Sequence, residues 1–229
     1  CMMLTGMVDT MMLSSVGDAA VGAVGTANTY IGVFIIMFNI ISSGMIAVMT
    51  QYIGANRPGI AYQAKQIGAI FNFILGIILS VLLFLFSGKI LEMVGVAPLL
   101  LGFAKTYFQI VGGFCILNAV IPIYSSYLRA FGYTKQPLVA TIIGNLLNLV
   151  LNAFFLYVMK WGVAGVAIAT VISRIVNLII NIVCARVLIS ANKDKERIKN
   201  TEVFAQIIKI GLPSAFETAL YNIAMTLTI

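Results

Sequence analysis

Polar side chains lie at similar depths in three apolar segments of this chain. Asp9 lies about five residues before the first segment ends, and Asn152 lies about eight residues before a short turn at 160–162. Thr170 lies about eight residues after that turn. In helices, which rise about 1.5 Å per residue, all three would lie roughly 7–12 Å from the same end. Asn148 is one turn deeper and on the face of Asn152, because residues four apart are neighbours on a helix.

Together these side chains would supply one carboxylate, two amide oxygens and one hydroxyl. Hard cations prefer oxygen ligands, so one negative charge among neutral oxygens suits a monovalent cation such as sodium. A buried carboxylate can also carry a proton, because burial disfavours its charged form. The sequence therefore predicts a cation-binding site made by Asp9, Asn148, Asn152 and Thr170, and it leaves sodium and the proton as alternatives.

Two features compete with this interpretation. Arg174 follows Thr170 by one helical turn, so it could pair with Asp9 and modulate the site by competing with the cation. Asn and Thr in membrane helices also often form only hydrogen bonds between helices, which contribute about 0.6 kcal/mol on average. A carboxylate within a helix is harder to explain by packing, because its insertion costs roughly 2.5–3.5 kcal/mol. We therefore expect a functional role for Asp9 above all.

Seven apolar segments must position these side chains. Of the 229 residues, 61% are hydrophobic and 9% charged, whereas a soluble domain is near half apolar and about a quarter charged. About 20 apolar residues cross the hydrocarbon core as a helix, and a membrane β-barrel would show short alternating segments instead. We predict an all-α, polytopic membrane bundle with both chain ends inside helices, a bend at Pro122, and helices over roughly 1–13, 27–53, 66–86, 106–128, 136–159, 162–189 and 204–229.

Lys and Arg residues between the segments predict the orientation, because cytoplasmic loops carry an excess of both. If 14–26 is an outer loop, only Lys89, Lys105 and Lys160 lie outside. This bias explains the net charge of +7 without a nucleic-acid partner, and it places the polar connector Ser190–Glu202 on the cytoplasmic side of a cell membrane. The residues on that side would be Arg57, Lys65, Arg129, Lys135, Arg186, Lys193, Lys195, Arg197, Lys199 and Lys209.

Residue types that other functions require are missing from the sequence. There is no His, and Cys1, Cys115 and Cys184 lie in apolar segments without a CxxC pair. Neither a zinc site nor a disulfide framework is therefore predicted. Because no pair of nucleophile and base is visible either, we expect a protein that is not an enzyme and that needs no cofactor beyond a coupling ion.

Six stretches carry a resemblance to a known family. They are Thr5–Met11 (TGMVDTM), Thr50–Asn56 (TQYIGAN), Leu128–Pro137 (LRAFGYTKQP), Asn148–Asn152, Gly162–Arg174 (GVAGVAIATVISR) and Gly211–Glu217 (GLPSAFE). In this order they resemble the first, second, fourth-to-fifth, fifth, sixth and seventh helical regions of MATE (multidrug and toxic compound extrusion) transporters. The match covers essentially the whole chain.

This resemblance implies half of a twelve-helix carrier with two lobes. Residues 1–189 would form the six-helix N-lobe, 190–203 a cytoplasmic connector, and 204–229 the start of the C-lobe. The carrier would be a monomeric antiporter that exports organic, cationic compounds in exchange for sodium or protons. Family members often carry an acidic residue on the seventh helix, so Glu217 is a candidate for contacting substrate in the cavity.

The resemblance also concerns the cation site. In the family, an N-lobe site uses the positions that match Asp9, Asn148, Asn152 and Thr170. Some members have Asp where this chain has Asn152, so the present set contains a single carboxylate.

Two other functions remain as alternatives. A flippase for lipids or lipid-linked glycans has a similar fold, but it should have a strongly cationic cavity, and Arg174 is the only cation expected in a membrane core. A scaffold subunit that transports nothing would not need its polar residues at a common depth.

Overall fold

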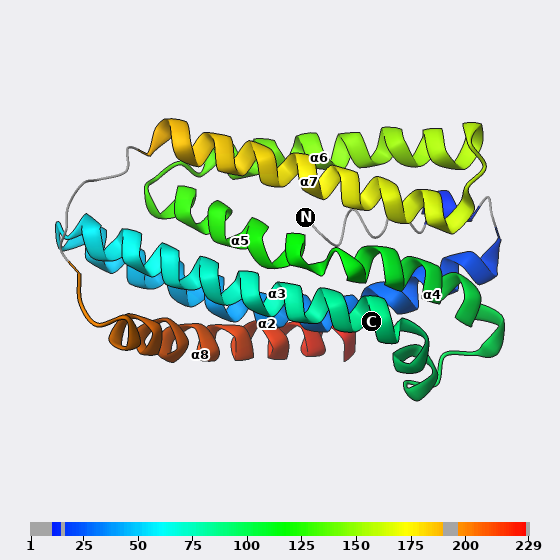
Figure 1. The fold of residues 1–229 in the computed structure, drawn as a ribbon, viewed down its shortest axis with the longest axis horizontal. Helices are drawn as coiled ribbons and strands as arrows, with labels where there is room; N and C mark the ends of the chain where they lie inside the picture. The colour runs from blue at the N-terminus through cyan, green and yellow to red at the C-terminus, as the bar shows by residue number, and fades with distance from the viewer. Residues whose placement is uncertain (1–10, 15–16, 190–196, 228–229) are drawn as a thin grey trace.

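The computed structural model is a bundle of helices aligned with one long axis (Figure 1). It describes residues 11–14, 17–189 and 197–227, and of the side chains after 214 only those of 216 and 217. These residues contain no strand, which confirms the all-α prediction. The helices are α2 (Asp18–Gly54), α3 (Pro58–Met93), α4 (Pro98–Gly113), α5 (Cys115–Ala130), α6 (Lys135–Ala153) with its π-helical continuation η1 (Phe154–Val158), α7 (Gly162–Leu188) and α8 (Asn200–Leu227).

Several of these helices are long and apolar enough to cross a membrane. Four meet this description, namely α2, α3, α7 and the combined α6 and η1, and the bent pair of α4 and α5 forms a fifth span if counted as one. Of the other expected segments, residues 1–10 lie outside the described part and α8 is not among these spans. Large apolar side chains are exposed along α3 and α6, among them Ile74, Phe84, Ile142 and Leu146. Lipid is the medium that can cover them, so this is a multi-pass membrane protein.

The second helix begins earlier than we predicted. Residues 18–26, expected in an outer loop, form the first turns of α2. Ala-rich sequence has a high helix propensity, and Asp18 in the first turn interacts favourably with the positive end of the helix dipole. With 37 residues, α2 is about 55 Å long and therefore exceeds the hydrocarbon core of roughly 30 Å.

The fourth apolar segment is broken, but well before Pro122. It consists of α4 and α5, which meet at 44° on either side of Phe114, while Pro122 lies inside α5. Two consecutive glycines, Gly112 and Gly113, precede the break, and such pairs are a common cause of sharp kinks. The break leaves the backbone N–H of Ile116 free to donate to Ser80 Oγ on α3 at 2.9 Å.

Helix α8 packs closely against α2 and α3 (Figure 1). A Cβ atom added at Gly44 would overlap the backbone oxygen of Ile207, and one added at Gly211 would overlap that of Ile40. The two backbones therefore touch without intervening side chains, as occurs where small residues line a helix interface.

A buried glutamine also ties the start of α8 to α3. Gln63 Nε2 donates to the carbonyl of Ile198 at 2.8 Å and to Asn200 Oδ1, and its Oε1 accepts from the N–H of Ile198 at 3.2 Å. These bonds connect α3 to the residues that lead into α8.

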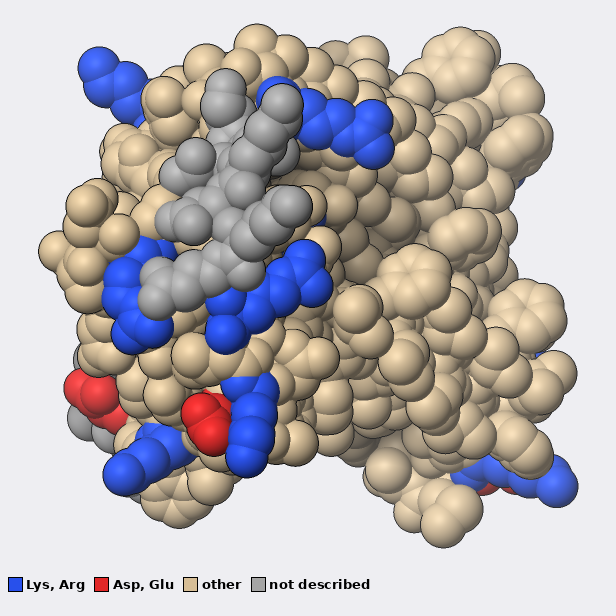
Figure 2. All heavy atoms as spheres, turned by 60° about the vertical axis from the view of Figure 1, so that its left-hand side comes forward, with Lys and Arg blue, Asp and Glu red and all other residues tan. Residues whose placement is uncertain are grey.

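The loop between α2 and α3, the loop between α5 and α6, the end of α7 and the start of α8 lie at one end of the bundle (Figure 1). Lys and Arg side chains gather around this end (Figure 2). Lys65, expected in a loop, lies within α3, where its ammonium group is 4.8 Å from the centre of the Tyr124 ring and 5.4 Å from that of Tyr127. Cation–π contacts of this kind stabilise a charge among apolar helices.

Candidate functional site

The hairpin of α6, η1 and α7 positions three of the predicted site residues. Its turn contains Lys160 and Gly162 with φ angles of 56° and 55°, a conformation that glycine adopts readily. The Trp161 N–H donates to the carbonyl of Phe155 at 3.0 Å. The two rings stack with centres 5.2 Å apart, and Gly165 leaves room for Phe155. These contacts connect the two helices at the turn, so their facing side chains meet further down.

The structure brings Asn148, Asn152 and Thr170 together in a chain of hydrogen bonds. Asn152 Nδ2 donates to Asn148 Oδ1 at 3.3 Å, and Asn148 Nδ2 donates to Thr170 Oγ1 at 3.4 Å. Thr170 Oγ1 in turn donates to the carbonyl of Val166 at 2.9 Å. The exposed fractions are 1%, 0% and 1% in the same order, so all three polar groups lie inside the bundle.

Thr170 bonds the deeper of the two asparagines. Thr170 and Asn152 lie about equally far from the turn, but Thr170 bonds Asn148, one turn deeper than Asn152. The chain therefore spans two turns of α6, and Asn148 lies one turn deeper than Asn152, as the sequence predicted.

This arrangement leaves acceptor capacity for a ligand. A carbonyl oxygen has two lone pairs, and a hydroxyl oxygen can accept twice. Asn148 Oδ1 accepts one of the bonds described above, so its second lone pair can face a cation. The three side chains are neutral, and the negative charge of the predicted site would come from Asp9, which lies outside the described residues.

Two further predicted residues lie apart from this chain. Arg174 is partly buried one turn beyond Thr170 on α7, and its buried Nη1 donates to none of the described residues. Glu217 is exposed on α8. Neither bonds Asn148, Asn152 or Thr170 within the described part of the chain.

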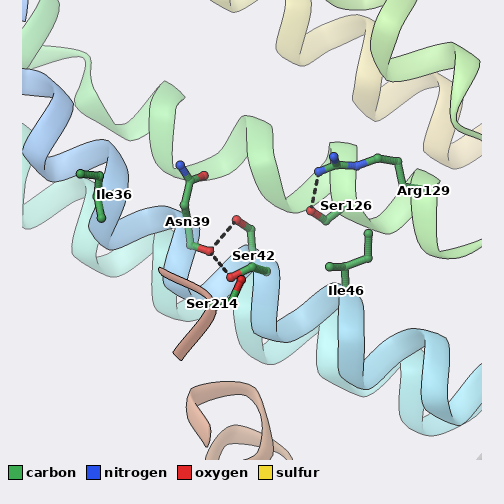
Figure 3. Close-up of a pocket in the computed structure, with 8 residues that line it drawn as sticks. Ile36, Asn39, Ser42, Ile46, Ser126, Arg129 and Ser214 are labelled. Carbon is green, nitrogen blue, oxygen red and sulfur yellow. Dashed lines mark hydrogen bonds between the residues drawn. The ribbon is translucent and has the colours of Figure 1, made fainter. Parts of the chain in front are cut away.

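The structure contains a cavity with several polar lining residues between α2, α5 and α8, which the sequence did not predict. It has a volume of about 260 Å³ and is lined by Ile36, Asn39, Ser42, Ser43, Ile46, Ser126, Arg129 and Ser214. Figure 3 shows Asn39 and Arg129 on facing helices. One sequence signal was available, since Asn39, Ser42 and Ser43 form a polar patch at helical spacing within the apolar segment 27–53.

Comparisons with known proteins agree on one family. The family model described as MatE matches residues 1–154. An uncharacterized transporter of Bacillus subtilis, YisQ, is 32% identical over 228 residues, covering 97% of this chain and 50% of the relative. A probable multidrug resistance protein of Thermotoga maritima, NorM, is 25% identical over 96% of this chain and 48% of its own length. The chain thus spans about half the length of these curated relatives.

The solved structures show the same fold. A crystal structure described as MATE in the bent conformation superimposes with a TM-score of 0.86 at 22% sequence identity. The superposition covers 97% of this chain and 50% of that structure.

Proposed function

Because this chain belongs to the MatE family of membrane transporters, we propose that it forms half of a monomeric antiporter that exports small organic compounds. Export would be driven by sodium ions or protons entering the cell. The observation that carries this proposal is the buried chain of Asn148, Asn152 and Thr170, because polar groups inside a membrane bundle are costly and mark the paths of ions and substrates.

The proposed carrier has two lobes, which rock against one another around a central cavity. Residues 1–189 form the first lobe, 190–203 a cytoplasmic connector, and 204–229 the start of the second lobe. The chain's coverage of about half of its relatives supports this division.

The proposed coupling site consists of Asp9 together with Asn148, Asn152 and Thr170. We favour sodium over the proton, because three neutral oxygens around one carboxylate are more than a proton requires. Arg174, one turn away, would modulate the affinity of the site by its positive charge.

Transport by the full-length protein in proteoliposomes tests both the function and the ion. With a sodium gradient and the pH clamped, we expect efflux of an organic cation, and with a pH gradient in sodium-free buffer we expect much less. The opposite result would assign the proton, and no efflux under either gradient would contradict the antiporter.

Glu217 provides a prediction about the substrate. We propose that its carboxylate meets cationic compounds in the central cavity between the two lobes, since it lies on α8 one turn beyond Ser214, which lines the smaller cavity between α2, α5 and α8. Glu217→Gln should then reduce transport of cationic compounds about tenfold, because a charge-assisted contact contributes roughly 1.5–3 kcal/mol, and should spare neutral compounds. The matched control is Glu202→Gln, an exposed carboxylate in the first turn of α8. Equal losses for cationic and neutral compounds would indicate a role in folding or coupling instead.

The orientation can be measured by labelling single cysteines in a variant without native cysteines. We expect a cysteine at Asn192, in the basic connector outside the described residues, to resist an impermeant maleimide applied to intact cells. A cysteine at Asp18, exposed at the start of α2, should react. Permeabilised cells control for reactivity, and the reverse pattern would invert the proposed topology.

A further inference from the structure

We propose that the cavity between α2, α5 and α8 binds the carboxylate group of a small organic molecule. That this molecule is a transported substrate rests on the proposed function, whereas its binding rests on the cavity alone. The volume of about 260 Å³ is slightly below the range of roughly 300–1,000 Å³ that is typical of small-molecule sites, so the cavity would hold a small group such as a carboxylate and its nearest atoms.

The charge of the cavity favours an anion. Among the described residues that line it, Arg129 is the only charged one. Its Nη2 donates to Ser126 Oγ at 3.1 Å, and the 1% exposure of Ser126 places this partner firmly in the helix packing. One bond uses only one of the five N–H groups of a guanidinium, and the remaining fork matches the geometry of a carboxylate.

The facing wall supplies a second donor. The amide of Asn39 projects from α2 toward α5 (Figure 3) and bonds none of the described residues. The hydroxyls of Ser42 and Ser43 instead donate to the Asn39 carbonyl at 3.3 and 2.7 Å.

The Ser42 hydroxyl has two acceptors on its own helix. Its oxygen lies 3.3 Å from the carbonyl oxygen of Phe38 as well as from that of Asn39, so its proton is shared within the helix. Arg129 and Asn39 supply donors to the cavity from opposite walls.

The rest of the lining suits an organic body. Ile36 and Ile46 add apolar surface beside the polar groups, as is usual where a few polar contacts orient a largely apolar ligand. The described lining contains no carboxylate, so the positive charge of Arg129 disfavours an organic cation at this position. The cavity thus complements Glu217, which would contact a different, positively charged part of a substrate.

The third wall depends on the docking of α8. Ser214 lines the cavity from α8, one turn after Gly211, whose backbone touches that of Ile40. Because Ile40 directly follows Asn39, the helix contact and the cavity share one region of α2. Binding should therefore require α8 to lie against α2.

Ligand-observed NMR titrations of the purified full-length protein test the proposal. The probes are benzoate, its uncharged analogue benzamide, benzylammonium and phenyl phosphate. We expect benzoate to bind saturably. Benzamide and benzylammonium should bind at least about tenfold more weakly, since hydrogen bonds to charged groups are stronger than those between neutral groups. Arg129→Lys, which preserves the charge but loses the fork, should weaken benzoate binding about tenfold, and Asn39→Leu about fivefold. Lys135→Gln, a basic residue at the same end but outside the cavity, should leave it unchanged.

Three results would overturn the site. They are equal binding of benzoate and benzamide, benzoate binding that persists in both Arg129→Lys and Asn39→Leu, and tighter binding of phenyl phosphate than of benzoate. The transport assay separates this proposal from the proposed function. Benzoate binding without driven efflux would reject only the antiporter, and efflux without benzoate binding would reject only this cavity.

Discussion

Replacing Asp9 with asparagine is expected to reduce gradient-driven efflux to background while the protein is still expressed and inserted. Among Asp9, Asn148, Asn152 and Thr170, only Asp9 carries a charge. A monovalent cation loses hydration energy when it enters the membrane interior. A carboxylate offsets this cost better than neutral oxygens do, because its charge attracts the cation more strongly. The effect is measured as transport of an organic cation by the protein in proteoliposomes, once under a sodium gradient and once under a pH gradient. Asp18→Asn, at the exposed start of α2, is the matched control and should transport normally.

The three neutral ligands should show a graded effect. Asn148→Ala, Asn152→Ala and Thr170→Ala each remove one oxygen of several, so each should weaken the apparent affinity for the ion without abolishing transport. Asn148→Ala should have the largest effect of the three, because Asn148 bonds both of the others. Thr141→Ala is the control, since among the described residues the Thr141 hydroxyl bonds only the Pro137 carbonyl of its own helix. Full transport by Asp9→Asn under either gradient would falsify the site.

The hairpin of α6 and α7 shows what could be predicted from sequence. Segments 136–159 and 162–189 were expected, and the structure has helical residues over 135–158 and 162–188. Each segment is a long apolar run of membrane-spanning length, and a short turn with a glycine separates them. The positions of Asn148, Asn152 and Thr170 relative to that turn were enough to predict that they would lie near one another.

Contacts between distant helices could not be predicted in the same way. In the sequence, Arg129 indicates only the cytoplasmic side, and Asn39 lies in a different apolar segment. They line one cavity because α2 and α5 pack side by side, which no local pattern specifies. The break at Phe114 has a similar origin, since the Ile116 N–H that it releases is satisfied by Ser80 of another helix.

Helix α8 shows a related limit. Its pairing with α2 depends on Gly44 and Gly211, two among 20 glycines. Glycine is common in membrane helices, so its presence in the sequence did not distinguish a helix contact from a lipid-facing position.

Replacing Gly44 with valine should strongly weaken the packing of α8 against α2. The added Cβ would overlap the backbone oxygen of Ile207, and backbone cannot rotate away as a flexible side chain can. The helices must therefore separate, at a cost of about 3 kcal/mol or more. We expect a lower midpoint of thermal unfolding and weaker crosslinking, by a short bismaleimide, of cysteines placed at Phe71 and Phe204, whose ring centres lie 5.2 Å apart.

Gly32→Val provides the matched control on the same helix. A Cβ at Gly32 has nothing within 4 Å, so this variant carries the same change in helix propensity without the overlap. Equal effects of the two substitutions would attribute the loss to α2 itself rather than to its contact with α8. If the contact is responsible, Gly44→Val should also weaken benzoate binding, because Ser214 would leave the cavity. Gly32→Val should preserve it, and this difference would connect the docking of α8 to the binding of a ligand.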